Sequence, residues 1–76
     1  MMTNKNKKQI LMTIGDNIRK YRIEKGLSQE QLAFECELHR TYIGAVERGE
    51  RNITVLNLIK IKNELGVTLE DLYPEK

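Results

Sequence analysis

The sequence is short of several residue types on which small proteins often depend. Its 76 residues contain one cysteine, one proline, one histidine and no tryptophan. The lone Cys36 excludes an intramolecular disulfide and, within an apolar pattern, is interpreted as a small buried side chain of an intracellular protein. The longest uninterrupted apolar run is Ile10-Leu11-Met12, far short of a membrane span. The polar N-terminus lacks the apolar segment of a signal peptide, so we expect one soluble cytoplasmic domain over residues 1–76, with no membrane partner.

Residues that carry catalysis or hold metals are also scarce. His39 is the single histidine, and together with Cys36 it makes neither a nucleophile–base–orienter set nor a metal site. The chain has no phosphate-cradling glycine loop and no carboxylate cluster resembling a metal site. We therefore expect a protein that is not an enzyme and that needs no cofactor and no metal.

The net charge of +2 is small, but its distribution is uneven. Residues 1–25 carry a charge of +5 and the remainder carries −3. A basic first segment suits a polyanion such as nucleic acid. A merely solvated lysine tail explains Lys5, Lys7 and Lys8 equally well.

Apolar spacing predicts helices and no strand. Leu11, Ile14 and Ile18 recur at helical intervals, and Ser28 with Gln31 three residues later is typical of a capping box. Five helices are expected. The first covers residues 8–24, the second runs from Ser28 to a turn at Glu37 and Leu38, and the third covers residues 39–48. The fourth runs from the Thr54 cap to residue 65, and a short fifth helix begins at the Thr68 cap and ends at Pro74. The fold class is a compact all-α domain of five helices.

The second and third helices are separated by too few residues to lie antiparallel. A turn of three or four residues sets two helices near perpendicular, which is the geometry of a helix-turn-helix, here at about residues 28–48. The run LSQEQLAFECELHRTYIGAVERGE then resembles the XRE-type helix-turn-helix family, which includes phage repressors and Cro proteins. The residues that carry this resemblance are Gln29, Leu32, Ala33, Ile43, Val46 and Glu47.

One residue departs from the family pattern. The family often places glycine in the turn, where this chain has Glu37. A residue other than glycine at positive φ costs roughly 1 kcal/mol. The turn is therefore expected to be either slightly strained or differently shaped.

The run LHRTYIGAVERGERNIT, with the long lysine-bearing first helix, is similar to the controller proteins of restriction–modification systems. These are small homodimeric regulators that bind operators upstream of their own gene and the endonuclease gene. The resemblance implies double-stranded operator DNA and a second copy of the chain as partners, with RNA polymerase as a further candidate. Other regulators of the phage-repressor or antitoxin type, and a protein-interaction module on the same fold, remain alternatives.

The resemblance makes the third helix the recognition helix. A helix in the major groove needs side chains that reach base edges and little bulk that holds its backbone away. The residues expected to contact bases are Arg40, Thr41, Tyr42, Gly44 and Ala45. Gly44 has an alternative role in avoiding a clash with another helix, and Tyr42 has one as a half-buried side chain with an exposed hydroxyl.

Backbone contacts are expected around that face. The residues assigned to them are Gln29, His39, Arg48, Arg51 and Asn52. Arg51 could instead enter a groove, Arg48 could be solvated, and His39 could cap the helix. The family also pairs an arginine of the first helix with a glutamate at the end of the third, which here are Arg22 and Glu47, unless these are unrelated surface charges.

The helix after residue 54 carries two apolar sides. Leu58, Ile61 and Leu65 form a stripe that should pack on the helix-turn-helix core. A second side needs a cover, either from the first or fifth helix or from a second copy of the chain. The helices at about residues 54–73 are therefore the expected dimerisation region, with interface residues Val55, Leu56, Ile59, Leu69, Leu72 and Tyr73.

Overall fold

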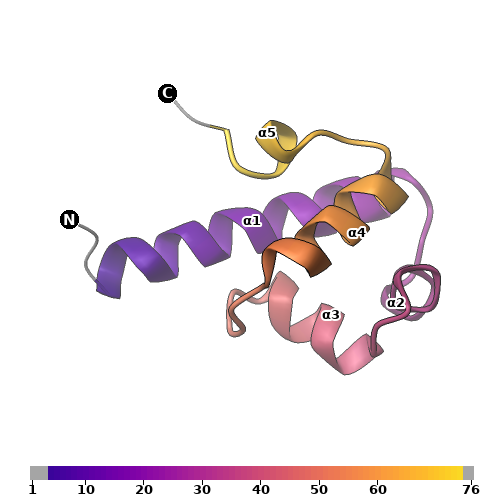
Figure 1. Cartoon of the computed structure of the whole chain (residues 1–76), viewed down its shortest axis with the longest axis horizontal. Helices are drawn as coiled ribbons and strands as arrows, with labels where there is room; N and C mark the ends of the chain where they lie inside the picture. Colours follow the sequence, from indigo (N-terminus) through magenta and orange to yellow (C-terminus); the bar gives the residue numbers. More distant parts are fainter. Residues whose placement is uncertain (1–3, 75–76) are drawn as a thin grey trace.

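A computed structural model describes residues 4–74, which form five α-helices and no strand (Figure 1). The helices are α1 (Asn4–Glu24), α2 (Gln29–Cys36), α3 (Arg40–Glu47), α4 (Val55–Leu65) and α5 (Leu69–Leu72). The expected all-α class and the number of helices are confirmed within this part of the chain. The start of α1 was predicted four residues too late, because its first turns carry polar side chains that give no apolar period.

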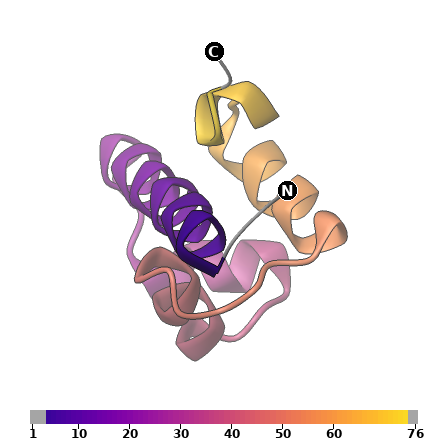
Figure 2. The same cartoon turned by 90° about the vertical axis from the view of Figure 1, so that its left-hand side faces the viewer.

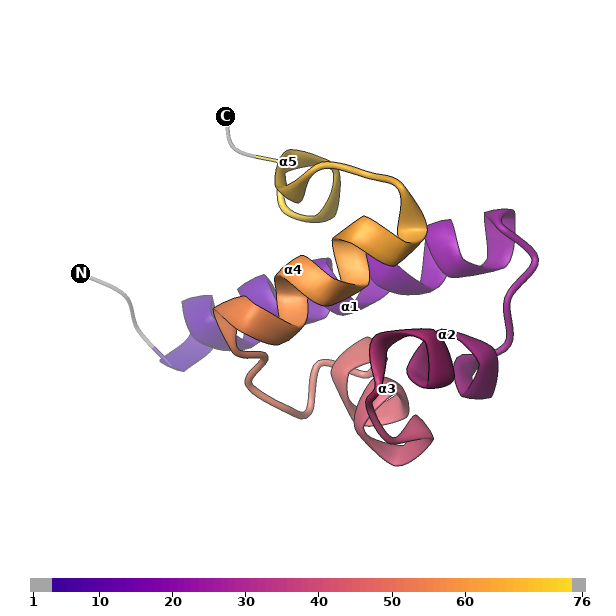
Figure 3. The same ribbon diagram turned by 45° about the vertical axis from the view of Figure 1, so that its right-hand side comes forward.

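The long helix α1 is the support on which the other helices are arranged. Figure 2, which looks along the molecule from its left-hand side, shows α2 and α3 below α1, with α4 and α5 beside and above it. Figure 3 shows α3 leaving the turn after α2 in a new direction, beneath α1 and α4. Five side chains that are almost completely buried close the core, and each helix supplies one of them: Ile18, Leu32, Ile43, Ile61 and Leu72.

The helix starts follow the predicted caps. The Ser28 hydroxyl accepts from the Gln31 backbone N–H at 3.0 Å, while the Ser28 N–H donates to the Gln31 side chain at 2.8 Å, so the capping box is complete. At the start of α4 the Thr54 hydroxyl accepts from the Asn57 backbone N–H at 3.1 Å. Thr68 forms a second capping box with Asp71 at the start of α5. Each cap satisfies backbone N–H groups that the first helical turn leaves without a partner.

The turn between α2 and α3 is built on Glu37. Its φ of 58° and ψ of 40° place it in the left-handed region, and within residues 4–74 it is the one residue other than glycine at positive φ. The N–H of Leu38 donates to the Ala33 carbonyl at 2.8 Å and closes the end of α2. The chain therefore keeps the family's turn geometry and accepts the strain, which is the first of the two expected outcomes.

Gly15 explains how closely α1 approaches the end of α3. A Cβ atom at Gly15 would clash with the Val46 carbonyl oxygen and would lie 2.7 Å from that of Glu47. Gly49, just after α3, lies against Met12 in the same way. Because these glycines lack a side chain, the two helix backbones touch where a larger residue would hold them apart.

A buried ion pair joins α1 to α3 at that contact. The Nε of Arg22 donates to Oε2 of Glu47 at 2.6 Å, and a second guanidinium nitrogen donates to Oε1 at 3.0 Å. The third guanidinium nitrogen of Arg22 donates to the Leu27 carbonyl at 2.8 Å. Arg22 is 8% exposed and Glu47 is 5% exposed. The predicted brace behind the recognition helix is confirmed, and the alternative of two unrelated surface charges is excluded.

We predict that Glu37→Gly raises the free energy of unfolding by about 0.5–1 kcal/mol, because glycine adopts the left-handed region without strain. Urea denaturation measures the change. Glu35→Gly is the matched control, since Glu35 is exposed within α2 and glycine there should destabilise the helix by about 1 kcal/mol. A lower midpoint for Glu37→Gly would show that the turn is not strained.

We predict that Glu47→Ala lowers the free energy of unfolding by about 3 kcal/mol or more, because the Arg22 charge would remain buried without its partner. Arg22→Ala should cost a similar amount, and the double variant should cost less than the two single changes added together. Glu50→Ala, which breaks the exposed pair with Arg48, is the control and should change stability by under about 1 kcal/mol. Small additive effects of the Arg22 and Glu47 variants would contradict the brace.

Candidate nucleic-acid interface

The predicted recognition helix α3 has one buried side and one open side. Its first turn is capped by His39, whose Nδ1 accepts from the Thr41 N–H at 3.1 Å. Ile43, Val46 and Glu47 face the core. On the opposite side Arg40, Thr41 and Arg48 are exposed and Ala45 is partly exposed. The open side therefore combines two arginines with small side chains, as a helix that lies against base edges requires.

Gly44 lies one helical turn after Arg40 on α3, and its contact with bases stays a prediction. It is buried, and a Cβ atom there would lie 3.2 Å from an Arg48 guanidinium nitrogen and 3.4 Å from the Gln29 side-chain oxygen. The side chains of Gln29 and Arg48 thus cover it. Gln29 belongs to α2, and it would meet this Cβ atom at ordinary van der Waals distance, so the structure shows no clash with a neighbouring helix that the glycine avoids.

Gln29 of α2 joins the buried ion pair of α1 and α3. Its Nε2 donates to Oε1 of Glu47 at 3.0 Å, and its side chain is half-buried. The Glu47 carboxylate therefore accepts from both α1 and α2. A phosphate contact by Gln29 stays a prediction, and the bond to Glu47 was not predicted because it depends on how α2 packs against α3.

Tyr42 lies at the edge of the open side and is half-buried. Its hydroxyl accepts from the Asn57 side chain of α4 at 3.1 Å, and the Arg51 guanidinium carbon lies 5.1 Å from its ring centroid. The alternative of a half-buried tyrosine holds for the ring, but the hydroxyl is bonded to α4. Asn57 was missed by the sequence analysis, because apolar spacing identifies the buried side of α4 and says nothing of a polar residue beside it.

The remaining predicted backbone contacts lie at the end of α3 and in the following loop. The Arg48 Nε donates to Glu50 at 3.0 Å, and both side chains are well exposed. Arg51 and Asn52 are exposed in the loop before α4. Four polar side chains are thus exposed on α3 and the segment directly after it: Arg40, Arg48, Arg51 and Asn52.

Of the six residues predicted for the dimer interface on α4 and α5, four are exposed, Tyr73 is half-buried and Leu72 is buried. Ile61 and Leu65 are buried and Leu58 packs against them, as the apolar stripe requires. On the other side of α4, and on α5, the exposed apolar side chains are Val55, Leu56, Ile59 and Leu69. Neither α1 nor α5 covers them, so that alternative is wrong.

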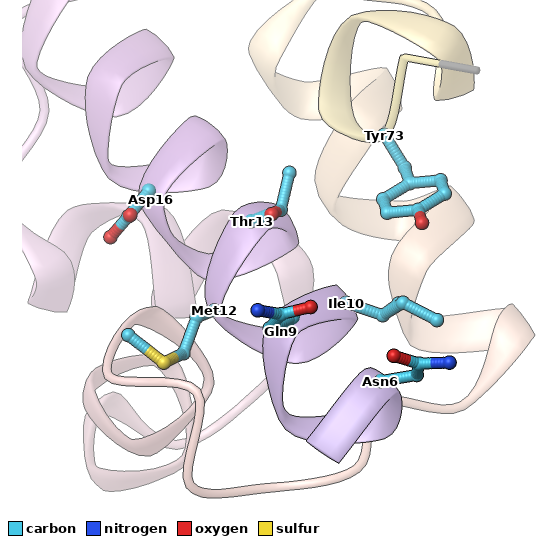
Figure 4. A pocket seen from close by; sticks show the side chains of 7 residues that line it. All are labelled: Asn6, Gln9, Ile10, Met12, Thr13, Asp16 and Tyr73. Atoms are coloured by element: carbon cyan, nitrogen blue, oxygen red, sulfur yellow. The ribbon is translucent and has the colours of Figure 1, made fainter. Parts of the chain in front are cut away.

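Leu72 is fully buried in the core and is not available to a partner chain. Tyr73 is half-buried against the same core and lines a hollow beside the first turns of α1, near Gln9, Ile10 and Thr13 (Figure 4). The short α5 turns its last residues inward, because the Asn17 side chain of α1 donates to the Leu72 carbonyl at 2.9 Å. The spacing in the sequence predicted that Leu69, Leu72 and Tyr73 share one exposed surface. In the four-residue α5 only Leu69 is exposed.

Other kinds of site find little support among the described residues. Residues 4–74 contain no group of three or more His, Cys, Asp or Glu side chains that could hold a metal ion. No helix in this part of the chain is long and apolar enough to cross a membrane. Burial raises the pKa of the Cys36 thiol to about 11, with a further contribution from Glu64, so the thiol stays protonated and unreactive at neutral pH.

Known proteins with similar sequences and structures are regulators. A helix-turn-helix family model matches residues 18–72. Control protein C.BamHI of Bacillus amyloliquefaciens is 49% identical over 72 residues, which cover 93% of this chain and 84% of that protein.

Two solved structures agree. The restriction–modification controller protein C.AhdI from Aeromonas hydrophila is 43% identical, with a TM-score of 0.79, over 83% of this chain and 96% of that one. The controller protein C.Esp1396I, solved as a tetramer in complex with its natural 35-base-pair operator, is 35% identical, with a TM-score of 0.73, over 83% of this chain and 93% of that one.

These matches confirm the resemblance that the sequence indicated, both to the XRE-type fold and to controller proteins. They also agree with the geometry of α2, the Glu37 turn and α3. The chain therefore belongs to the helix-turn-helix family, and its relatives there include the control proteins of restriction–modification systems.

Proposed function

We propose that this chain is a transcription regulator of the controller class, which binds operator DNA in a sequence-specific manner as a homodimer. The observation that carries the proposal is the open side of α3, with Arg40 and Thr41 exposed on a helix that Arg22 and Glu47 hold from behind. A recognition helix must be rigid to discriminate between base pairs, because loosely held side chains adapt to several sequences.

The side chains divide into two roles. Arg40 can donate two hydrogen bonds to guanine, Thr41 can offer a hydroxyl and a methyl group, and Ala45 allows close approach. Phosphate contacts position the helix without reading sequence, and we assign them to Gln29, His39, Arg48, Arg51 and Asn52. For Arg48 this requires exchanging Glu50 for a phosphate, which is easy because the pair is exposed.

The exposed apolar side of α4 supports self-association. Val55, Leu56, Ile59 and Leu69 are 37% to 72% exposed, and three of them lie within five residues of α4. Exposed apolar side chains that gather on one element favour an interaction site. A two-fold axis there would place two recognition helices roughly 34 Å apart, one DNA turn, and so read a near-palindromic operator. The solved C.Esp1396I complex is itself an oligomer on DNA.

Three further features belong to the proposal. The protein acts by binding and is not an enzyme, because its regulator relatives and its chemistry give it no reaction to catalyse. It works in the cytoplasm, where operators are found. RNA polymerase is its candidate partner at the promoter.

The test is binding to duplex DNA as a function of salt. A duplex recovered from a randomised library and a random duplex of the same length serve as probes. A DNA-binding regulator should lose affinity for both steeply as salt rises, because the counterions released on binding gain less entropy when they enter a more concentrated salt solution. A protein-interaction module on the same fold would bind neither duplex measurably.

We predict that Arg40→Ala weakens binding to the recovered duplex by about 1–3 kcal/mol per half-site and changes binding to the random duplex far less, because a guanine contact carries sequence information. Fluorescence anisotropy with both duplexes measures the two affinities. Lys20→Ala is the control, since it removes one exposed positive charge from α1. Equal losses on both duplexes, with the fold intact, would remove Arg40 from the base-reading residues.

We predict that Ile59→Asp gives a folded monomer, because a charge in the middle of the exposed apolar side of α4 would have to be desolvated on association. Its affinity for the recovered duplex should fall by roughly 10²-fold, since two linked half-sites bind far more tightly than one. Sedimentation and circular dichroism measure mass and helicity. Asn63→Asp, at an exposed position of the same helix, is the control and should stay dimeric. A monomeric wild-type protein at micromolar concentration would contradict the dimer.

A further inference from the structure

Three side chains from three different segments meet beside the open side of α3. Tyr42 belongs to α3, Arg51 to the loop that follows, and Asn57 to the first turn of α4. The Asn57 amide donates to the Tyr42 hydroxyl at 3.1 Å, and the Arg51 guanidinium lies over the other part of the same side chain, its carbon 5.1 Å from the ring centroid. Tyr42 therefore connects α4 to an exposed arginine.

The Asn57 end of this connection is firmly placed. The Asn57 backbone N–H donates to the Thr54 hydroxyl at 3.1 Å, as part of the cap that starts α4. Both Asn57 and Tyr42 are half-buried. Since the amide projects from a capped helix turn, its bond to the hydroxyl restricts how the Tyr42 ring can turn.

The Arg51 end is the part that DNA would meet. Arg51 is exposed, and a long side chain in a loop has many conformations to lose when it binds. A guanidinium stacked on an aromatic face keeps its N–H groups, which lie in its own plane, free to donate. A fixed Tyr42 ring beneath Arg51 would thus reduce the number of conformations that the Arg51 side chain can adopt. It would leave the guanidinium N–H groups free to donate to DNA.

We propose that Asn57 is a positioning residue for DNA binding, which fixes the Tyr42 ring and through it presents the Arg51 guanidinium to the duplex. This inference rests on the proposed function. It adds a residue of α4 that sits between the exposed Leu56 and the core-packed Leu58, so the helix proposed to join two copies of the chain also orders a DNA contact.

The test is to make Asn57→Leu in the wild-type chain and in Arg51→Ala. Leucine has a similar size but cannot donate to the hydroxyl. Affinity for the duplex recovered from the randomised library is measured with each protein. We expect Asn57→Leu to weaken binding about fivefold in the wild-type chain, and to have an effect below about twofold when Arg51 is already alanine, because the two changes remove one contact.

Tyr42→Phe provides a second route to the same answer. It removes the acceptor and leaves the ring, so it should match Asn57→Leu, and the combined variant should bind no more weakly than either alone. It also keeps the test decisive if Asn57→Leu shifts the denaturant midpoint. Asn63→Leu is the matched control, an exposed asparagine of the same helix that should bind like wild type.

Two results would overturn the inference. A loss from Asn57→Leu that is as large in Arg51→Ala as in the wild-type chain would mean that Asn57 acts independently of Arg51. Unchanged affinity for both Asn57→Leu and Tyr42→Phe would mean that the connection does not contribute to binding. Failure of the proposed function is distinct, because the wild-type chain would then bind neither the recovered nor the random duplex.

Discussion

The carboxylate of Glu47 accepts hydrogen bonds from side chains of two other helices, and the position of α3 depends on it. Arg22 reaches it from α1 at 2.6 and 3.0 Å, and Gln29 reaches it from α2 at 3.0 Å. Gly15 allows α1 to come close enough for the ion pair to form, because its missing side chain leaves room for the α3 carbonyls. Removing this carboxylate would therefore loosen the contacts of α3 with two helices at once.

The molecule presents two different surfaces from adjacent elements. The open side of α3 carries polar side chains and small ones, whereas the exposed side of α4 carries apolar side chains. Tyr42 and Asn57 lie at the boundary between them and hold the two helices in register. A subunit that joins a partner through α4 would consequently set the angle at which its own α3 meets the DNA, because the connection between the two is short and partly buried.

Much of the fold was predictable, because local signals and apolar spacing agree. Ser28, Thr54 and Thr68 each mark a helix start, and the stripe of Ile61 and Leu65 is buried as its spacing requires. The failures have physical reasons. Spacing alone cannot tell a core leucine from an exposed one on a helix as short as α5, so Leu72 was placed on the wrong surface. The role of Asn57 depends on which side chain of another helix lies beside it, which no local pattern records.

The distribution of the core over the helices has a consequence for how the chain unfolds. Every helix contributes one fully buried side chain, and the Asn17 amide of α1 holds the Leu72 carbonyl of α5 across 55 residues of sequence. Even the short last helix thus takes part in sealing the interior of this small domain. Amide protons in the buried turns that carry these five side chains should then exchange together in one cooperative opening, while the exposed helix ends exchange earlier.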